Sequence, residues 1–282
     1  MKENRFSTPE NIPYQEVLDA LLDDDRVLAP RYLYRLTDLM PEELEQLQDI
    51  WSSISDRRRR ALLEDLEELT EKNTLLSFEA VFRFAMHDQD SQVRFYAIRA
   101  IEVFDTDDLI GMFLRVLEED ESEDVRAVTA SVMGKYVYQG EIDEISDEQQ
   151  KTIEDKLLGV LNSDEPPRIK RRALEAISYS PRSEVHQQIS DAYRRDSDEW
   201  QASALFAMGR SYDHRYDDKV ISKILHPSPK VRAEAVRASG ELYLEEAVPE
   251  IIDLLDDVPR VRRAAIWALS QIGGEGVAEA IL

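Results

Sequence analysis

A basic residue recurs at an equivalent place in five segments of this sequence, each time directly after an apolar residue: Arg94, Arg126, Lys170, Arg232 and Arg262. A row of such cations could bind successive phosphates. Alternatively, each cation could bond to an acidic side chain or a turn carbonyl of a neighbouring segment. Acidic residues stand near the preceding turns: Asp88, Asp120, Asp164 and Asp256. Because the formal net charge is −24, phosphate backbones are repelled and the structural role is expected.

The four consecutive arginines at 57–60 form the one dense basic run. Such a run can contact nucleic acid or an acidic partner. Carboxylates that allow pairing one helical turn away follow on the same predicted helix: Glu64, Asp65, Glu67 and Glu68. We therefore expect a self-neutralised, solvated helix here.

Acidic residues concentrate in the middle of the chain. Residues 105–165 hold 18 acidic and 5 basic residues, a net charge of −13. This acidity could serve solubility, reflect a saline habitat or attract a basic partner. Within it, residues 139–150 form an acidic insertion between two segments of the repeat described below. A mobile loop and a docking site for a basic segment are both open interpretations, and the residues lack the spacing of a calcium loop.

Catalytic signatures are missing from the sequence. There is no cysteine, so thiolate chemistry, disulfides and Cys-ligated zinc are excluded. Glycine-rich phosphate loops and nucleophile elbows are also absent. We predict no catalytic residue, no metal and no cofactor. No apolar run is long enough to span a membrane, and no secretory signal is recognised, so the expected compartment is the cytoplasm.

An internal repeat predicts the elements that must position any site. Six segments align on one apolar anchor: Val93, Val125, Ile169, Trp200, Val231 and Val261. Small or apolar residues follow at four, five and eight positions after each anchor, which makes one apolar helical face. Four anchors have an N-cap residue three positions earlier: Asp90, Ser122, Ser197 and Ser228. Three glycines nine positions after an anchor are expected to end their helices: Gly134, Gly209 and Gly240.

A second apolar run follows each turn, and helix–turn–helix units of about thirty residues indicate an α-solenoid. These second runs cover 109–117, 153–161, 185–193, 220–225 and 247–255. Helices are also expected at 41–54, 55–69 and 75–86. We predict an all-α, right-handed superhelix of about six to eight antiparallel helix pairs. Residues 1–87 would form a capping region with one degenerate repeat, and residues 88–282 the repeats proper, the last of them incomplete.

Residues Val231–Leu255 and Val261–Leu269 resemble the HEAT-repeat family, in particular the short repeats of phycobilisome-associated lyases. The shared pieces are a Val-Arg pair followed by Ala-Val, an Ala-Val-Pro leading to Leu-Leu, and a Val-Arg-Arg-Ala-Ala run. The resemblance covers about residues 88–282. It implies the fold and leaves the function open.

Enzymes of HEAT-like architecture were compared with this sequence. Dinuclear-iron hydroxylases of this architecture need His-Glu pairs, which none of the four histidines forms. HEAT-like DNA glycosylases need a basic face, which the net charge opposes. Because bilin lyases share the repeat, the alternative function is a lyase-type accessory protein that handles a chromophore or cofactor.

The favoured function is a non-catalytic scaffold that binds a basic or amphipathic protein segment, with no nucleic acid and no membrane. One expected contact surface is the concave face, lined by the second helices. Its outward residues are Met112, Arg115, Lys156, Gln187, Gln188, Asp191, Lys223, Glu250 and Asp253. The other is an edge of tyrosines at the turns, which supply contact area with little loss of entropy. These are Tyr136, Tyr138, Tyr179, Tyr212, Tyr216 and Tyr243. Phe206 and Trp267 stand six positions after their anchors, in a row of outward-pointing residues. Each could contact a partner protein or cover a neighbouring loop.

Overall fold

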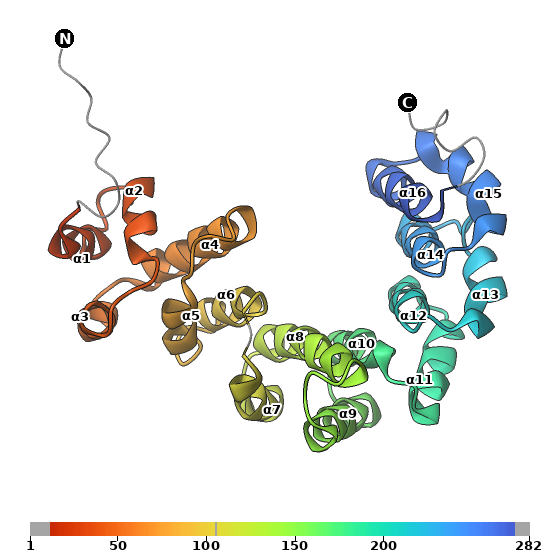
Figure 1. Cartoon of the computed structure of the whole chain (residues 1–282), viewed down its shortest axis with the longest axis horizontal. Coiled ribbons are helices and arrows are strands. Elements are labelled where there is room, and N and C mark those ends of the chain that lie inside the picture. The colour runs from red at the N-terminus through yellow and green to blue at the C-terminus, as the bar shows by residue number, and fades with distance from the viewer. Residues whose placement is uncertain (1–11, 105, 274–282) are drawn as a thin grey trace, which may run out of the picture. The chain divides into compact units, whose positions relative to one another are not determined.

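The computed structural model describes residues 12–104 and 106–273, and within these residues every regular element is helical (Figure 1). The predicted all-α solenoid of helix pairs is confirmed. We call a helix that carries an anchor a first helix and the helix after it a second helix. No helix among the described residues is long and apolar enough to cross a membrane.

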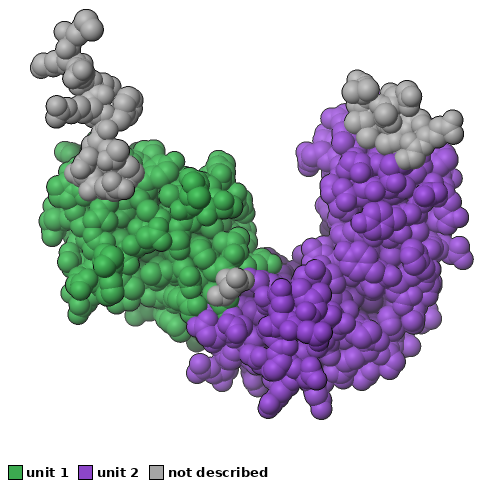
Figure 2. All heavy atoms as spheres, viewed as in Figure 1, with its two compact units in different colours: residues 1–106, 120–129 green, residues 107–119, 130–282 purple. Residues whose placement is uncertain are grey.

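The chain forms two compact units (Figure 2). The first comprises residues 1–106 with 120–129, and the second comprises residues 107–119 with 130–282. The sequence-based boundary at residue 87 falls inside the first unit. Its helices are α1 (Tyr14–Leu22), α2 (Pro30–Leu33), α3 (Pro41–Trp51), α4 (Asp56–Lys72), α5 (Glu79–Ala85) and α6 (Ser91–Ile101).

Helix α8 (Glu123–Glu141) contributes residues to both units. The second unit holds four further first helices: α10 (Pro167–Ala176), α12 (Asp198–Arg210), α14 (Pro229–Glu241) and α16 (Pro259–Ile272). Its second helices are α7 (Ile110–Glu119), α9 (Asp147–Asn162), α11 (Ser183–Tyr193), α13 (Asp217–Ile221) and α15 (Val248–Asp253). The five predicted second runs and the three helices expected between residues 41 and 86 are therefore present, whereas α1 and α2 were not predicted.

The six anchors form the core of the repeats, as the sequence predicts. None is more than 8% exposed, and the residues four and eight positions after them are fully buried or nearly so. Ile266, five positions after the last anchor, is the exception at 41% exposed. Its equivalents in the other first helices are buried. In the described part of the chain no helix follows α16 to cover that side.

The starts of the first helices follow the sequence signals. The Asp90 carboxylate accepts hydrogen bonds from the backbone N–H groups of Gln92 and Val93, at 3.0 and 3.1 Å. Pro167, Pro229 and Pro259 each open a helix, where the missing N–H has no intrahelical partner to lose. Ser197 and Ser228 occupy the predicted N-cap positions of α12 and α14, but neither side chain makes a capping hydrogen bond in the part of the chain that the structure describes. Local chemistry therefore predicted where these helices begin, but not how all of them are capped.

The three glycines were predicted to mark helix ends: Gly209 and Gly240 do lie one residue before the ends of α12 and α14, but Gly134 does not, and none acts as a cap. Gly134, Gly209 and Gly240 lie inside α8, α12 and α14, and none has a positive φ. A methyl group on Gly240 would lie 2.8 Å from the Cα of Ala268, and one on Gly209 would lie 2.9 Å from the Cα of Ala238. Glycine is therefore used here because consecutive first helices approach too closely for a side chain.

The acidic insertion is mostly helical rather than a long loop. Helix α8 runs to Glu141 and α9 begins at Asp147, so five residues connect them. These two helices have 19 and 16 residues, whereas the other helices of the second unit have at most 14. The extra residues therefore lengthen one helix pair.

The first helices of the second unit form the tighter of its two rows. Helix α12 packs directly on α14, and α14 on α16, whereas the second helices α11, α13 and α15 contact one another far less. Figure 1 shows α12, α14 and α16 on the inner side of this part of the unit, and α11, α13 and α15 on the outer side. The expectation that second helices line the inner face is therefore wrong for these repeats. Glycine and alanine allow the first helices to approach one another closely, so the first helices form the inner row.

Candidate functional site

The recurring basic residue has a structural role at three of its five positions. Arg232 donates to both oxygens of the Asp257 carboxylate at 2.8 Å, and to the carbonyls of His226 and Pro227 at 2.8 and 2.9 Å. We call this arrangement an arginine clasp, because it joins the turn before a first helix to the turn before the next. The sequence suggested Asp256, and the partner is its neighbour.

Arg94 forms the same clasp in the first unit. It binds Asp120 through two hydrogen bonds of 2.8 Å and donates to the carbonyls of Asp88 and Gln89. Arg126 donates to the Asp120 carbonyl at 2.6 Å. Because these guanidinium groups are occupied within the fold, they are not a phosphate-binding row.

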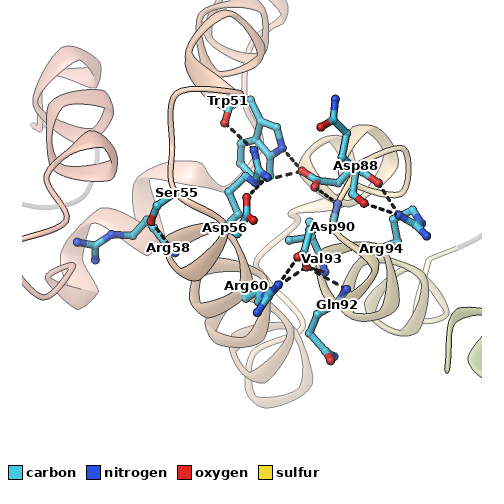
Figure 3. A network of polar contacts seen from close by, with 12 residues as sticks. Trp51, Ser55, Asp56, Arg58, Arg60, Asp88, Asp90, Gln92, Val93 and Arg94 are labelled. Atoms are coloured by element: carbon cyan, nitrogen blue, oxygen red, sulfur yellow. Dashed lines mark hydrogen bonds and ion pairs between the residues drawn. The ribbon is translucent and has the colours of Figure 1, made fainter. Parts of the chain in front are cut away.

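Three arginines of the run at 57–60, Arg58, Arg59 and Arg60, are also bound within the first unit, although their partners differ from those expected. Arg59 pairs with Asp56 at 2.6 Å and with Asp88 at 3.3 Å, and Asp88 also accepts from the Trp51 indole. Arg60 binds the Asp90 carboxylate and lowers its pKa. Figure 3 shows this network.

The expected partners on the same helix bind elsewhere: Glu67 pairs with Arg99 and Glu68 with Lys72. Most of the run is neutralised by tertiary contacts that spacing along one helix does not reveal.

The histidines make ordinary structural contacts. His186 Nδ1 lies 3.0 Å from the Tyr216 hydroxyl, and His214 Nδ1 lies 3.0 Å from an Asp217 oxygen. The backbone N–H of Ser228 donates to His226 Nδ1. Within residues 12–104 and 106–273, no three histidine or acidic side chains converge as a metal site would require.

The predicted second-helix residues lie outside the core, but they do not form one continuous site. Lys156 pairs with Glu118 at 2.5 Å, Gln188 donates to Asn162, and Lys223 donates to Gln201. On α11, Gln187 donates to Asp191 at 2.9 Å. The remaining members are Met112, Arg115, Glu250 and Asp253, none of them classed as buried. Among the described residues of this set, only Gln187 and Asp191 bond to each other, whereas Lys156, Gln188 and Lys223 bond to residues outside it; the members on α11, α13 and α15 stand on the outer row.

The tyrosines separate into buried and exposed sets. Tyr136 is 1% exposed and packs on Phe113, while the buried Tyr216 meets His186. Tyr138, Tyr212 and Tyr243 are 44%, 59% and 61% exposed. Tyr179 is half-buried, with its ring centroid 5.0 Å from that of Tyr138. We use the name tyrosine edge for Tyr138, Tyr179, Tyr212 and Tyr243, all in the second unit.

Two tyrosines of this edge occupy a backbone position that normally favours glycine. Tyr212 and Tyr243 have φ values of 50° and 55°, two residues past the ends of α12 and α14. After α14 the N–H of Tyr243 bonds to the carbonyl of Gly240, and the N–H of Leu244 bonds to that of Ser239. This is the Schellman pattern, in which the residue after the cap is left-handed. A non-glycine residue there is strained by about 1–2 kcal/mol.

A row of stacked rings and guanidinium groups adjoins the tyrosine edge on the first helices. Arg210 lies over the rings of Tyr179 and Phe206, at 5.4 and 4.7 Å from their centroids. Arg237, from the next first helix, covers Phe206 at 4.3 Å. Phe206 is therefore covered by its own chain. Trp267, at the equivalent position of α16, is 39% exposed and packs beside Gly240.

The four tyrosines of the edge are close enough to influence one another electrostatically. Burial raises the pKa of Tyr212, and the charges of Glu241, Tyr243 and Tyr138 raise it further. Burial also raises the pKa of Tyr179, with the Arg210 charge opposing it. Glu241 binds Arg237, and burial raises the pKa of its carboxyl. The tyrosine edge is thus one surface that crosses the repeats of the second unit.

Two pockets outside the tyrosine edge are large enough to hold a small molecule. One of about 480 Å³ in the first unit is lined by Tyr34, Arg35, Met40 and Glu43, among others. Its Arg35 and Glu43 pair with each other. One of about 220 Å³ lies between α7 and α9 and includes Lys156, already paired with Glu118. Their polar groups are largely satisfied by neighbours, so neither presents a set of groups awaiting a ligand.

Comparison with known proteins supports the repeat type. The family described as HEAT repeats matches residues 218–282, which covers α14 to α16 and the end of the chain. The HEAT-repeat resemblance is thereby confirmed for this part of the chain, and the comparisons do not single out the lyase type. No curated protein matches the chain.

Several solved structures are similar to this chain at low identity. Human deoxyhypusine hydroxylase in complex with glycerol shares 14% identity, with 94% of this chain and 96% of that chain covered and a TM-score of 0.39. Importin beta in an ammonium sulfate condition shares 15% identity, with 94% and 41% covered and a TM-score of 0.46. Kap95p, from a structure on its binding to RanGDP, shares 14%, with the same coverage and a TM-score of 0.45.

The chain thus spans about two fifths of importin beta and Kap95p. One of these similar proteins is a hydroxylase. At these scores the likeness carries no conclusion about the activity or partners of this chain.

Proposed function

We propose that this protein is a non-catalytic scaffold that binds a basic or amphipathic protein segment along the tyrosine edge of its second unit. The supporting observation is that Tyr138 in the last turn of α8, and Tyr212 and Tyr243 in the turns after α12 and α14, expose 44–61% of their surface while remaining within electrostatic reach of one another. Exposed tyrosines supply large contact area with few rotatable bonds, which suits protein recognition. The expected compartment is the cytoplasm.

A protein segment fits this surface better than a nucleic acid does. The arginines of the clasps and three of the four arginines at 57–60 are already bound, and the formal net charge is −24. Nucleic-acid binding depends on free cations that displace counterions from phosphates. A row of rings that crosses successive repeats instead suits an extended segment laid across them.

The proposal is tested by selecting binders from a random peptide display library on the full chain. Each selected peptide is then titrated against the double variant Tyr212→Ala/Tyr243→Ala. Because hot-spot aromatics each contribute more than about 1 kcal/mol, we expect affinity to fall by about tenfold or more.

A matched control replaces outer-row residues instead, as Gln187→Ala/Gln188→Ala on α11. Peptides that bind the edge should bind this control as tightly as the unchanged chain. If the selected peptides lose affinity only for the control variant, they bind the predicted second-helix residues, and the proposal that the tyrosine edge is the binding surface is wrong. If neither variant weakens any peptide, both surfaces are excluded.

A further inference from the structure

Cations cover some tyrosine rings among the described residues of the second unit, including Tyr179 of the tyrosine edge, and leave others uncovered. Tyr179 is covered by Arg210, Tyr193 by Lys223 and Tyr216 by Lys219, at 5.2–5.4 Å. Among the described residues, no arginine or lysine lies over Tyr138, Tyr212 or Tyr243. Three tyrosine rings of the second unit thus lie under a cation, and the three most exposed rings of the tyrosine edge do not.

In the described part of the chain, exposed carboxylates without a salt bridge follow two of these rings in the sequence. Asp143 and Glu144 follow Tyr138 in the turn after α8, and Glu245 and Glu246 follow Tyr243 in the turn after α14. All four are exposed, and within residues 12–104 and 106–273 none forms an ion pair. Elsewhere in the unit carboxylates are commonly paired, as Glu199 is with Lys230 and Glu234 with Arg260.

We infer that the tyrosine edge binds an extended segment rich in arginine or lysine. Its cationic side chains would lie on the faces of Tyr138, Tyr212 and Tyr243, and would pair with the carboxylates of the adjoining turns. A cation over a ring and a carboxylate beside it act on the same side chain, and the ring contributes more as water is excluded. This inference rests on the proposed function and adds the chemistry of the partner.

The backbone supplies an independent reason to assign Tyr212 and Tyr243 to binding. Both residues stand at φ values of 50° and 55°, where glycine would relieve the strain. Both side chains project into solvent, so packing does not explain why tyrosine stands there. Strain that the fold does not need is characteristic of residues held for recognition.

The experiment measures fluorescence anisotropy of the full chain with three labelled peptides of equal length. One alternates arginine with glycine and serine, one replaces each arginine by its neutral isostere citrulline, and one replaces each by glutamate. We expect the arginine peptide to bind, the citrulline peptide to bind with an affinity at least about tenfold lower, and the glutamate peptide not to bind. Binding should weaken as salt rises, because the carboxylates are exposed.

Two pairs of variants separate the edge from the general acidity of the chain. Tyr212→Gly/Tyr243→Gly should weaken the arginine peptide by about tenfold while leaving the melting temperature unchanged or higher, so misfolding does not explain the loss. Glu245→Gln/Glu246→Gln should also weaken it. Glu42→Gln/Glu45→Gln on α3 removes the same charge at exposed sites far along the chain and should leave the affinity unchanged.

Three results would overturn the inference. One is equal binding of the arginine and citrulline peptides, and another is equal binding by the unchanged chain and the double tyrosine variant. The third is an equal loss in both glutamate variants, which would mean attraction by net charge alone. If library peptides that depend on Tyr212 and Tyr243 carry no excess of arginine or lysine, the cationic partner is wrong while the scaffold function stands.

Discussion

The two ends of helix α14 are built in opposite ways. At its start, Arg232 makes four hydrogen bonds, to Asp257 and to two carbonyls, and its side chain is 15% exposed. At its end, Tyr243 stands 61% exposed with a φ of 55°. One end satisfies every group it brings out of water, whereas the other holds a large ring in solvent on a strained backbone.

This difference separates residues that stabilise the repeat from residues that the repeat presents. A charged residue withdrawn from water must be fully bonded, and the clasp meets that requirement. An exposed aromatic ring in a left-handed turn gains little for folding. The recurring arginine, the first candidate for chemistry in the sequence, therefore belongs to the fold, and the turn tyrosines are the better candidates for recognition.

The largest expected effect comes from breaking the clasp. Arg232→Ala removes two bonds to a carboxylate and two to carbonyls, so we expect the free energy of unfolding to fall by about 2–3 kcal/mol. Chemical denaturation of the variant and the unchanged chain measures this. Arg263→Ala, an exposed arginine on α16, is the control and should change stability by less than about 0.5 kcal/mol.

The same clasp gives a pH dependence of known sign. Arg232 lowers the pKa of Asp257, so the pair stabilises the fold above the ordinary carboxyl pKa of 3.8 and loses this contribution as pH falls below it. The difference between the unchanged chain and Arg232→Ala should therefore shrink in acid. A difference that stays constant to low pH would show that the ion pair is not its source.

A smaller effect of opposite sign is expected at the other end of the helix. Tyr243→Gly relieves a left-handed backbone strain of about 1–2 kcal/mol, which stabilises the folded chain. Glycine also gives the unfolded chain more conformational freedom, which lowers the stability by about 0.5–1 kcal/mol. The net gain in the free energy of unfolding should be about 1 kcal/mol, measured by denaturation. A clear loss of stability would mean that the ring packs on its neighbours and that the comparison between the two ends does not hold.

The smallest effect concerns Glu241, which lies between the tyrosine edge and Arg237. Burial raises the pKa of this carboxyl, so its charged form opposes folding, and its contribution to stability is largest at low pH and is lost as pH rises through the folded pKa. Glu241→Gln should therefore become more stable relative to the unchanged chain as pH rises from acid to neutral, as followed by thermal melting. The reverse trend would show that the pair with Arg237 outweighs the effect of burial.

Much of the fold was predictable because its signals are local. The anchors, the small residues four positions later and the N-cap at Asp90 depend on helical periodicity and on contacts within one turn. The turn positions of Tyr212 and Tyr243 were also predicted from their place in the repeat, whereas Tyr138, predicted at a turn, lies within α8. That these tyrosines from different repeats lie near one another was learned only from the structure.

The errors all involve contacts between repeats. Gly240 looked like a helix end because glycine often is one, and only the 2.8 Å approach to Ala268 reveals its role. Tyr136 and Tyr138 are two residues apart, yet one is buried against Phe113 and the other is exposed. The ion-pair partners of Arg58 and Arg60, and one of the two ion-pair partners of Arg59, come from outside their own helix. The cover of Arg210 and Arg237 over Phe206 was likewise missed.

By itself the sequence determined that this chain folds into stacked helix pairs, since an apolar stripe repeated every thirty residues has no other way to leave water. Only the tertiary structure decided which helices form the inner row, which charges are neutralised and which rings remain open. Those outcomes depend on the distance between neighbouring repeats, and that distance is set by how glycine and alanine let two helices meet.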